Sequence, residues 1–191
     1  MALAALPDTF AIVSFMAKNG IAATRVDGTL SFKIQFPRSL SVPISLSSTK
    51  PVCRNIPTVG SCKWTFRVNL PVKEQKTAIG WIFQDPPTTK YLTPDHVNIE
   101  PLSTSSSNAA TYISMGGAGF IYPSKSRASR GYAVTDTVET TLDFSSCEIS
   151  FSVNGQVVYT TTLSSEIDFA YPTISSDGGE VVAIASVENV L

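Results

Sequence analysis

Residues 131–179 read GYAVTDTVETTLDFSSCEISFSVNGQVVYTTTLSSEIDFAYPTISSDGG, and this stretch decides the fold. Two alternating segments, 149–153 and 157–161, are joined by Asn154 and Gly155. An Asn-Gly pair accepts the two positive φ angles of a type I′ turn, whose twist matches that of the flanking strands. The stretch therefore predicts a β-hairpin, and the turn decides which side chains of the two strands are buried.

Short alternating runs of apolar and polar residues continue outside the hairpin. In residues 29–36, Leu30, Phe32, Ile34 and Phe36 alternate with polar residues and predict a strand with one buried face. Further β-branched or aromatic runs lie at 10–15 and 40–46. Because no segment has a helical period, we expect an all-β fold of two antiparallel sheets packed face to face as a sandwich.

The composition favours one domain and excludes several classes of partner. A chain of 191 residues can bury a sizeable core as one sandwich. Its 14 basic and 15 acidic residues give no field that would attract nucleic acid or an anionic membrane. The apolar run 1–6 lacks the basic residues of a signal peptide and is too short to span a bilayer, so we expect a cytoplasmic or otherwise intracellular protein. The odd count of Cys53, Cys62 and Cys147 favours three reduced thiols over a Cys53–Cys62 bridge.

Five motifs occur in an order that resembles the SPRY domain, a protein-interaction module with a concanavalin A-like jelly-roll sandwich. They are the strand 62–68 led by Trp64, the Ile-Gly-Trp-Ile strand 79–82, the glycine turn 117–119, the Asp136 turn with Leu142 and Asp143, and the Asn-Gly hairpin followed by Tyr171 and Pro172. The resemblance covers about residues 60–186. It implies a non-catalytic domain that binds a peptide or another protein.

The chain departs from the SPRY pattern at three places. The family commonly has Gly before the Asp of its middle turn, where this chain has Thr135, and Thr140 stands where a small residue is usual. Residues 1–59 lack a PRY-type extension. We expect them to be a divergent strand extension packed on the core 60–186, within a single domain 1–191.

Catalysis and metal binding find no support in the sequence. His96 is the one histidine and lies in a Pro-rich loop with no nucleophile motif beside it. One histidine and three scattered cysteines do not supply a zinc site. Asp136, Glu139 and Asp143 lack an EF-hand frame and are interpreted as turn and strand-end residues. We therefore expect no enzyme activity, no metal and no cofactor.

Loops are the expected site of partner binding, since a rigid scaffold commonly presents binding residues on them. The resemblance implies that the segments after the Ile-Gly-Trp-Ile strand and after the Tyr-Pro strand lie at one binding end. Together with an aromatic residue in the Pro-rich loop, the predicted partner-binding residues are Phe83, Gln84, Asp85, Tyr91, Ser176, Asp177 and Gly178. Two alternatives are a carbohydrate-binding, lectin-like module and a structural subunit of a larger assembly that docks through residues 1–59.

Overall fold

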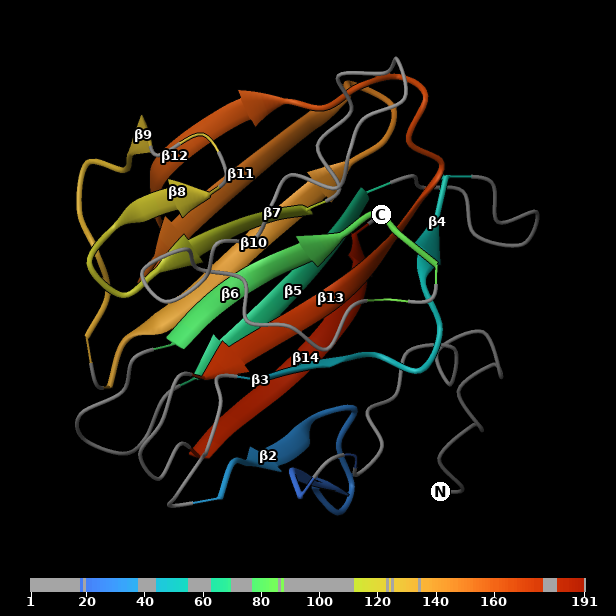
Figure 1. Ribbon diagram of the computed structural model, residues 1–191, viewed down its shortest axis with the longest axis vertical. Coiled ribbons are helices and arrows are strands. Elements are labelled where there is room, and N and C mark those ends of the chain that lie inside the picture. The colour runs from blue at the N-terminus through green and yellow to red at the C-terminus, as the bar shows by residue number, and fades with distance from the viewer. Residues whose placement is uncertain are drawn as a thin grey trace, which may run out of the picture.

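The computed structural model of the chain describes residues 18, 20–37, 44–54, 63–69, 77–85, 87, 112–122, 124, 126–133, 135–176 and 182–190. All regular structure in these residues is β-strand (Figure 1). The strands are β1 (Ala22–Arg25), β2 (Phe32–Gln35), β3 (Ile44–Ser47), β4 (Val52–Cys53), β5 (Lys63–Asn69), β6 (Thr77–Ile82), β7 (Tyr112–Gly116), β8 (Phe120–Tyr122), β9 (Ser126–Arg127), β10 (Thr137–Asp143), β11 (Glu148–Val153), β12 (Gln156–Thr162), β13 (Phe169–Ser176) and β14 (Val182–Val190). Within the described ranges, no helix has the length and apolar character needed to cross a bilayer.

The strands form two antiparallel sheets, which confirms the predicted sandwich. Sheet 1 has the order β1-β2-β14-β5-β10-β11-β12. Sheet 2 has the order β3-β13-β6-β7-β8-β9, and β4 pairs with β13 beside β3. Strands distant in sequence lie side by side in both sheets, such as β5 between β14 and β10. The chain therefore folds as a sandwich with long-range pairings and not as a row of hairpins.

The core lies between the sheets and confirms that both tryptophans are structural. Trp64 on β5 is 4% exposed, and Trp81 on β6 is fully buried. The ring of Phe66 meets that of Trp81 edge to face at a centroid distance of 6.1 Å. The Trp81 indole N–H donates to the Thr140 hydroxyl at 2.8 Å, which joins β6 of sheet 2 to β10 of sheet 1. The glycine between Ile79 and Trp81 is required, because a Cβ at Gly80 would lie 2.0 Å from the Ile113 carbonyl oxygen on β7.

The predicted hairpin is present. Asn154 and Gly155 have φ angles of 53° and 78°, as a type I′ turn requires, and Val153 pairs with Gln156. The register shifts after Phe151, so that Ser152 pairs with Val157 and Val158 is left as a bulge. The alternating pattern did not predict this bulge, which lets Val158 join the core while Val157 remains 57% exposed.

Strands from the N-terminal third contribute to both sheets. β2 pairs with β14 in sheet 1, and β3 pairs with β13 in sheet 2. Ile34 and Phe36 are fully buried in the core, as the alternation of 29–36 predicted. The predicted strand 10–15 lies outside the described residues. The dependence of the rest of the domain on residues 1–59 stays a prediction.

The turn that leads into β10 contains a strained residue. Thr135 has a φ of 71°, and a β-branched side chain is disfavoured in this left-handed region. The neighbouring Asp136 holds the turn, since its carboxylate accepts from the Ala133 N–H at 2.8 Å and from the Asn154 amide at 2.7 Å. These two hydrogen bonds, with the nearby Arg130 guanidinium, lower the pKa of Asp136. Thr135, where the sequence departs from the SPRY pattern, is thus strained in this turn.

We predict that Thr135→Gly raises the free energy of unfolding by roughly 0.5–1 kcal/mol, because glycine adopts positive φ without the steric penalty of a side chain. Urea denaturation measures the change. Thr160→Gly is the matched control, since Thr160 is exposed on the part of β12 that follows the bulge, and the loss of its side chain should lower stability. If both variants are destabilised to the same degree, Thr135 is not strained.

Candidate functional site

The segment that follows β6 is anchored to β13. Phe83 and Gln84 are half-buried and Asp85 is exposed. The Asp85 carboxylate accepts a hydrogen bond of 2.9 Å from the Tyr171 hydroxyl on β13. Burial of the Tyr171 ring, and then its contact with Asp85, raise the pKa of this phenol to about 12, so it remains a neutral donor at physiological pH. One side chain of a loop predicted to bind a partner is therefore held in a defined position.

Aromatic and aliphatic side chains surround this contact on the outer face of sheet 2. Tyr171 packs with Ala78 and Ile82 in a cluster separate from the main core, with Tyr112 and Phe169 packed against it. The rings of Phe169 and Tyr171 meet edge to face at 6.2 Å. Burial raises the pKa of Tyr112, with a smaller contribution from Tyr122, which marks this side chain as part of the same apolar surrounding. The Tyr171 ring, whose hydroxyl binds Asp85, is thus held in a packed apolar cluster.

The structure separates the two loop segments that the sequence analysis placed together. β6 and β13 are antiparallel, with Tyr171 opposite Ile82 and Ser176 opposite Thr77. Phe83 therefore leaves one end of the strand pair, while Ser176 is fully buried at the other end, on the order of 17 Å away along the strand. The prediction of one binding end that includes both segments was wrong. Tyr91, Asp177 and Gly178 lie outside the described residues.

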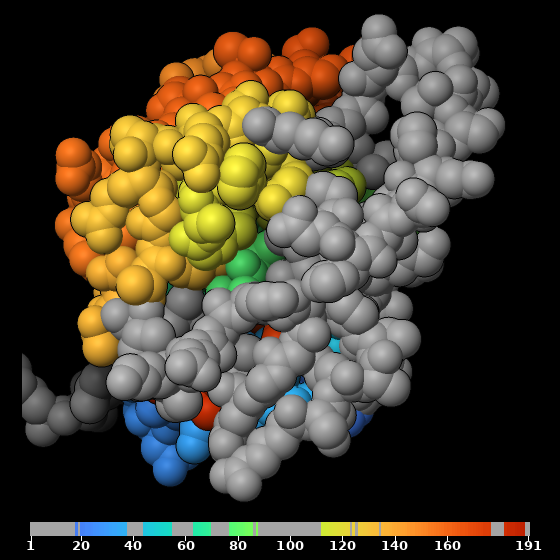
Figure 2. Space-filling model, turned by 60° about the vertical axis from the view of Figure 1, so that its left-hand side comes forward, coloured from blue at the N-terminus to red at the C-terminus, as the bar shows by residue number. Residues whose placement is uncertain are grey.

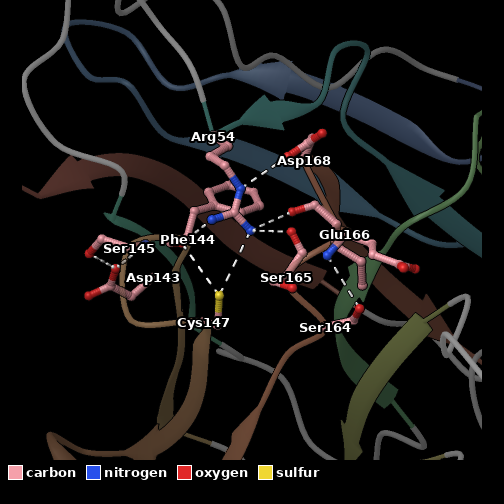
Figure 3. Close-up of polar contacts among 10 residues, drawn as sticks. Arg54, Asp143, Phe144, Ser145, Cys147, Ser164, Ser165, Glu166 and Asp168 are labelled. Atoms are coloured by element: carbon pink, nitrogen blue, oxygen red, sulfur yellow. Dashed lines mark hydrogen bonds and ion pairs between the residues drawn. The ribbon is translucent and has the colours of Figure 1, made fainter.

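The end of the sandwich that carries Asp85 also carries a second polar cluster around Arg54, and we call it the Asp85 end. Arg54 directly follows β4, which pairs Cys53 with Phe169, so it lies beyond the same end of β13 as Phe83. Its side chain reaches the turn between β10 and β11 and the loop between β12 and β13 (Figure 3).

The Arg54 guanidinium binds groups from two segments. Nε donates to the Asp168 carboxylate at 3.0 Å, and Nη2 donates to the carbonyl oxygens of Ser165 at 3.2 Å and Ile167 at 3.0 Å. Nη1 donates to the carbonyl oxygen of Phe144, and the guanidinium lies 5.4 Å from the centre of the Phe144 ring. These donors fix the loop from Ser164 to Asp168 against the body of the domain. Arg54 is a positioning residue for the Asp85 end.

Further hydrogen bonds hold the turn between β10 and β11 at the same end. Cys147 has a φ of 53°, and its thiol contacts the Phe144 carbonyl at 3.7 Å. The Asp143 carboxylate accepts from the backbone N–H of Ser145 and Ser146 at 2.8 and 3.2 Å. Burial alone would raise the pKa of Asp143, but the hydrogen bond from the Ser145 hydroxyl, and then those from the two backbone N–H groups, lower it. Asp143 is thus a strand-end residue, as predicted.

The opposite end, which we call the Asp136 end, is built from short polar contacts. Arg130 pairs with Asp136 at 3.2 Å, and the Thr137 N–H donates to the Asn154 side chain at 2.9 Å. The hydroxyl of Tyr132 donates to the Thr77 carbonyl at 2.8 Å, which ties this end to the start of β6. Asp136 is a turn residue, as predicted, and its partners account for both of its carboxylate oxygens.

Two features of the described residues concern metal binding and thiol chemistry. Across the ranges that the structure describes, no three His, Cys, Asp or Glu side chains gather closely enough to hold a metal ion. Burial, and then Asp168, raise the pKa of the Cys53 thiol, which disfavours its thiolate form. His96 lies outside the described residues.

Solved structures of SPRY domains share this fold. The SPRY domain of human HERC1 superposes with a TM-score of 0.57 at 10% identity, and the match covers 94% of this chain and 96% of that one. A human SPRY domain gives 0.56 at 14% identity over 87% and 94% of the two chains, and the TRIM65 PSpry domain gives 0.55 at 14% identity over 96% and 97%. No protein-family model matches the chain, and no curated protein sequence matches it either. The chain therefore has the SPRY-type β-sandwich fold, as its motifs predicted.

A similar architecture also occurs within a larger protein, a sialidase. The sialidase matches with a TM-score of 0.50 at 10% identity, and the match covers 94% of this chain and 17% of the sialidase. Because one sandwich fold hosts several activities, the fold alone does not assign the function.

We predict that Arg54→Lys lowers the free energy of unfolding by about 1–3 kcal/mol, because an ammonium group does not reproduce the fork of donors that reaches both the β10–β11 turn and the β12–β13 loop. Chemical denaturation measures the loss. Arg25→Lys is the control, since Arg25 is exposed and, within the described residues, its side chain donates one hydrogen bond, to the Thr29 carbonyl. This substitution should change stability by less than about 0.5 kcal/mol. Equal effects of the two substitutions would contradict the role assigned to Arg54.

Proposed function

We propose that this chain is a non-catalytic module that binds a protein or peptide through the Asp85 end of the sandwich. The observation that carries the proposal is the pair of anchors at that end. Tyr171 holds Asp85, and Arg54 holds the loop from Ser164 to Asp168, so exposed polar side chains sit on fixed backbone. A pre-organised surface loses less conformational entropy when a partner binds.

The SPRY-type fold supports a protein partner, since the family that the sequence resembles consists of protein-interaction modules. The solved SPRY domains of human HERC1 and TRIM65 have the same two-sheet architecture over almost the whole chain. In the sequence, Phe83, Gln84 and Asp85 follow the Ile-Gly-Trp-Ile strand, where family members commonly bind a short peptide. The proposal places binding on these residues and on the neighbouring loop, with no nucleic acid, membrane or cofactor involved.

Site-specific photo-crosslinking tests the location of binding. A photoreactive amino acid is placed at Gln84 on the Asp85 end, at Asp177 after β13, or at Thr24 on β1, and each variant is irradiated in extract from the native source. We expect a discrete protein adduct from position 84. An adduct from position 24 alone would replace this proposal with the structural-subunit alternative, in which the N-terminal strands dock.

Affinity for the crosslinked partner then tests the role of Asp85. We predict that Asp85→Ala weakens binding by about 1–2 kcal/mol, or roughly 5- to 30-fold in Kd, if Asp85 is an anchor. Tyr171→Phe removes the hydroxyl that orients Asp85 and leaves the ring in the cluster, so it should weaken binding by a smaller factor. Titration calorimetry measures both. Unchanged affinity in both variants would exclude Asp85 from the interface.

A further inference from the structure

β12 is an edge strand of sheet 1. In the described part of the chain its paired strand is β11, and no strand pairs with its other side. Figure 1 shows it as the outermost strand of its sheet, and orange atoms of this part of the chain lie at the upper rim of the surface in Figure 2. Its sequence QVVYTTT contains no charged residue. Natural edge strands are commonly protected by charges or proline, and β12 has neither.

The hydrogen-bond pattern shows which backbone groups of β12 point away from the sheet. The Leu163 N–H donates to the Cys147 carbonyl, on the β11 side. Because the direction of backbone groups alternates along a strand, the N–H and C=O of Thr160 and Thr162 face outward. The Ser129 N–H confirms this alternation, since it donates to the Val158 carbonyl at 2.9 Å from the open side. Thr160 and Thr162 are both exposed.

Two features limit the open part of the edge to a short segment centred on Thr161. The bond from Ser129 occupies the edge at Val158. At the other end, β12 stops at Thr162, and the chain turns where the Ile167 N–H donates to the Ser164 carbonyl. The open segment thus offers the outward backbone groups of Thr160 and Thr162, which number two donors and two acceptors.

We propose that two copies of this chain associate through this edge, with their β12 strands antiparallel about a two-fold axis at Thr161. In this register Thr160 of one copy pairs with Thr162 of the other, and the outward N–H and C=O groups satisfy one another. A two-fold axis requires a self-complementary surface, and this segment is one. Cross-strand Thr–Thr pairs are favourable neighbours in antiparallel sheets.

The side chains beside the segment fit the same arrangement. Tyr159 and Leu163 are partly buried and pack against the core. In the proposed register Tyr159 of one copy lies next to Leu163 of the other, so two apolar side chains meet on each side of the axis. The formal net charge of −1 and the uncharged strand remove like-charge repulsion between copies. A partner with charged side chains would gain no complementary charge from β12, which favours a second copy as the occupant.

Cysteine crosslinking tests the register directly. In this arrangement Thr161 faces Thr161 of the second copy as a non-hydrogen-bonded pair, with Cα atoms about 4.5 Å apart, which lies within the range for a disulfide. Thr161→Cys, oxidised with diamide, should therefore give a disulfide-linked dimer on non-reducing gels. The native chain controls for its own three cysteines. Ser150→Cys on β11 is the matched control, because Ser150 is opposite Thr160 but one strand away from the edge.

Sedimentation velocity provides a readout that does not depend on a new cysteine. Four backbone hydrogen bonds make a small interface, so association of the native chain should be weak and visible over roughly 10 µM to 1 mM. Thr160→Pro removes an outward N–H and no bond to β11, so it should abolish the association and leave the domain folded. A native chain that stays monomeric over this range, or a Thr161→Cys variant that crosslinks no more than Ser150→Cys, overturns the proposal.

Discussion

The hydrogen bond between the Trp81 indole and the Thr140 hydroxyl joins the two sheets at the middle of the core, and the rest of the structure depends on this contact. Both groups are fully buried, so each would lose its hydrogen bonds to water without the other. β6 and β10 are internal strands of their sheets, and the bond fixes how one sheet lies over the other. Phe66 and Gly80 complete the fit, since one packs on the indole and the other lets β7 approach closely.

The arrangement of the two sheets decides which side chains and loops lie at each end of the sandwich. β6 emerges at the Asp85 end, where Tyr171 holds Asp85 and Arg54 ties together the loops of both sheets. The Asp136 end is closed by short contacts around Asp136 and Asn154. The proposed partner site and the proposed self-association edge on β12 therefore adjoin, since the loop from Ser164 to Asp168 directly follows Leu163.

Local sequence patterns predicted the fold, whereas the position of the candidate site depends on strands that pair over long distances in the sequence. Alternation and the Asn-Gly turn predicted the β11–β12 hairpin and the core role of Trp64 and Trp81, because these depend on neighbouring residues. The opposite placement of Phe83 and Ser176 depends on the antiparallel pairing of strands about 90 residues apart, which no local motif encodes. Arg54 was missed for the same reason, since its partners lie far along the chain. Thr140 was visible as a departure from the family pattern, but its bond to Trp81 required the structure.

The stability of Thr140 variants tests the central contact most directly. Thr140→Val keeps the shape of the side chain and leaves the buried indole N–H without an acceptor, whereas Thr140→Ser keeps the hydroxyl. Urea denaturation should show a loss of about 1–3 kcal/mol for Thr140→Val relative to the native chain and a smaller loss for Thr140→Ser. The Trp81 indole proton in NMR spectra of Thr140→Val should also exchange faster with solvent. A Thr140→Val variant as stable as the native chain would contradict the claim that this bond holds the two sheets together.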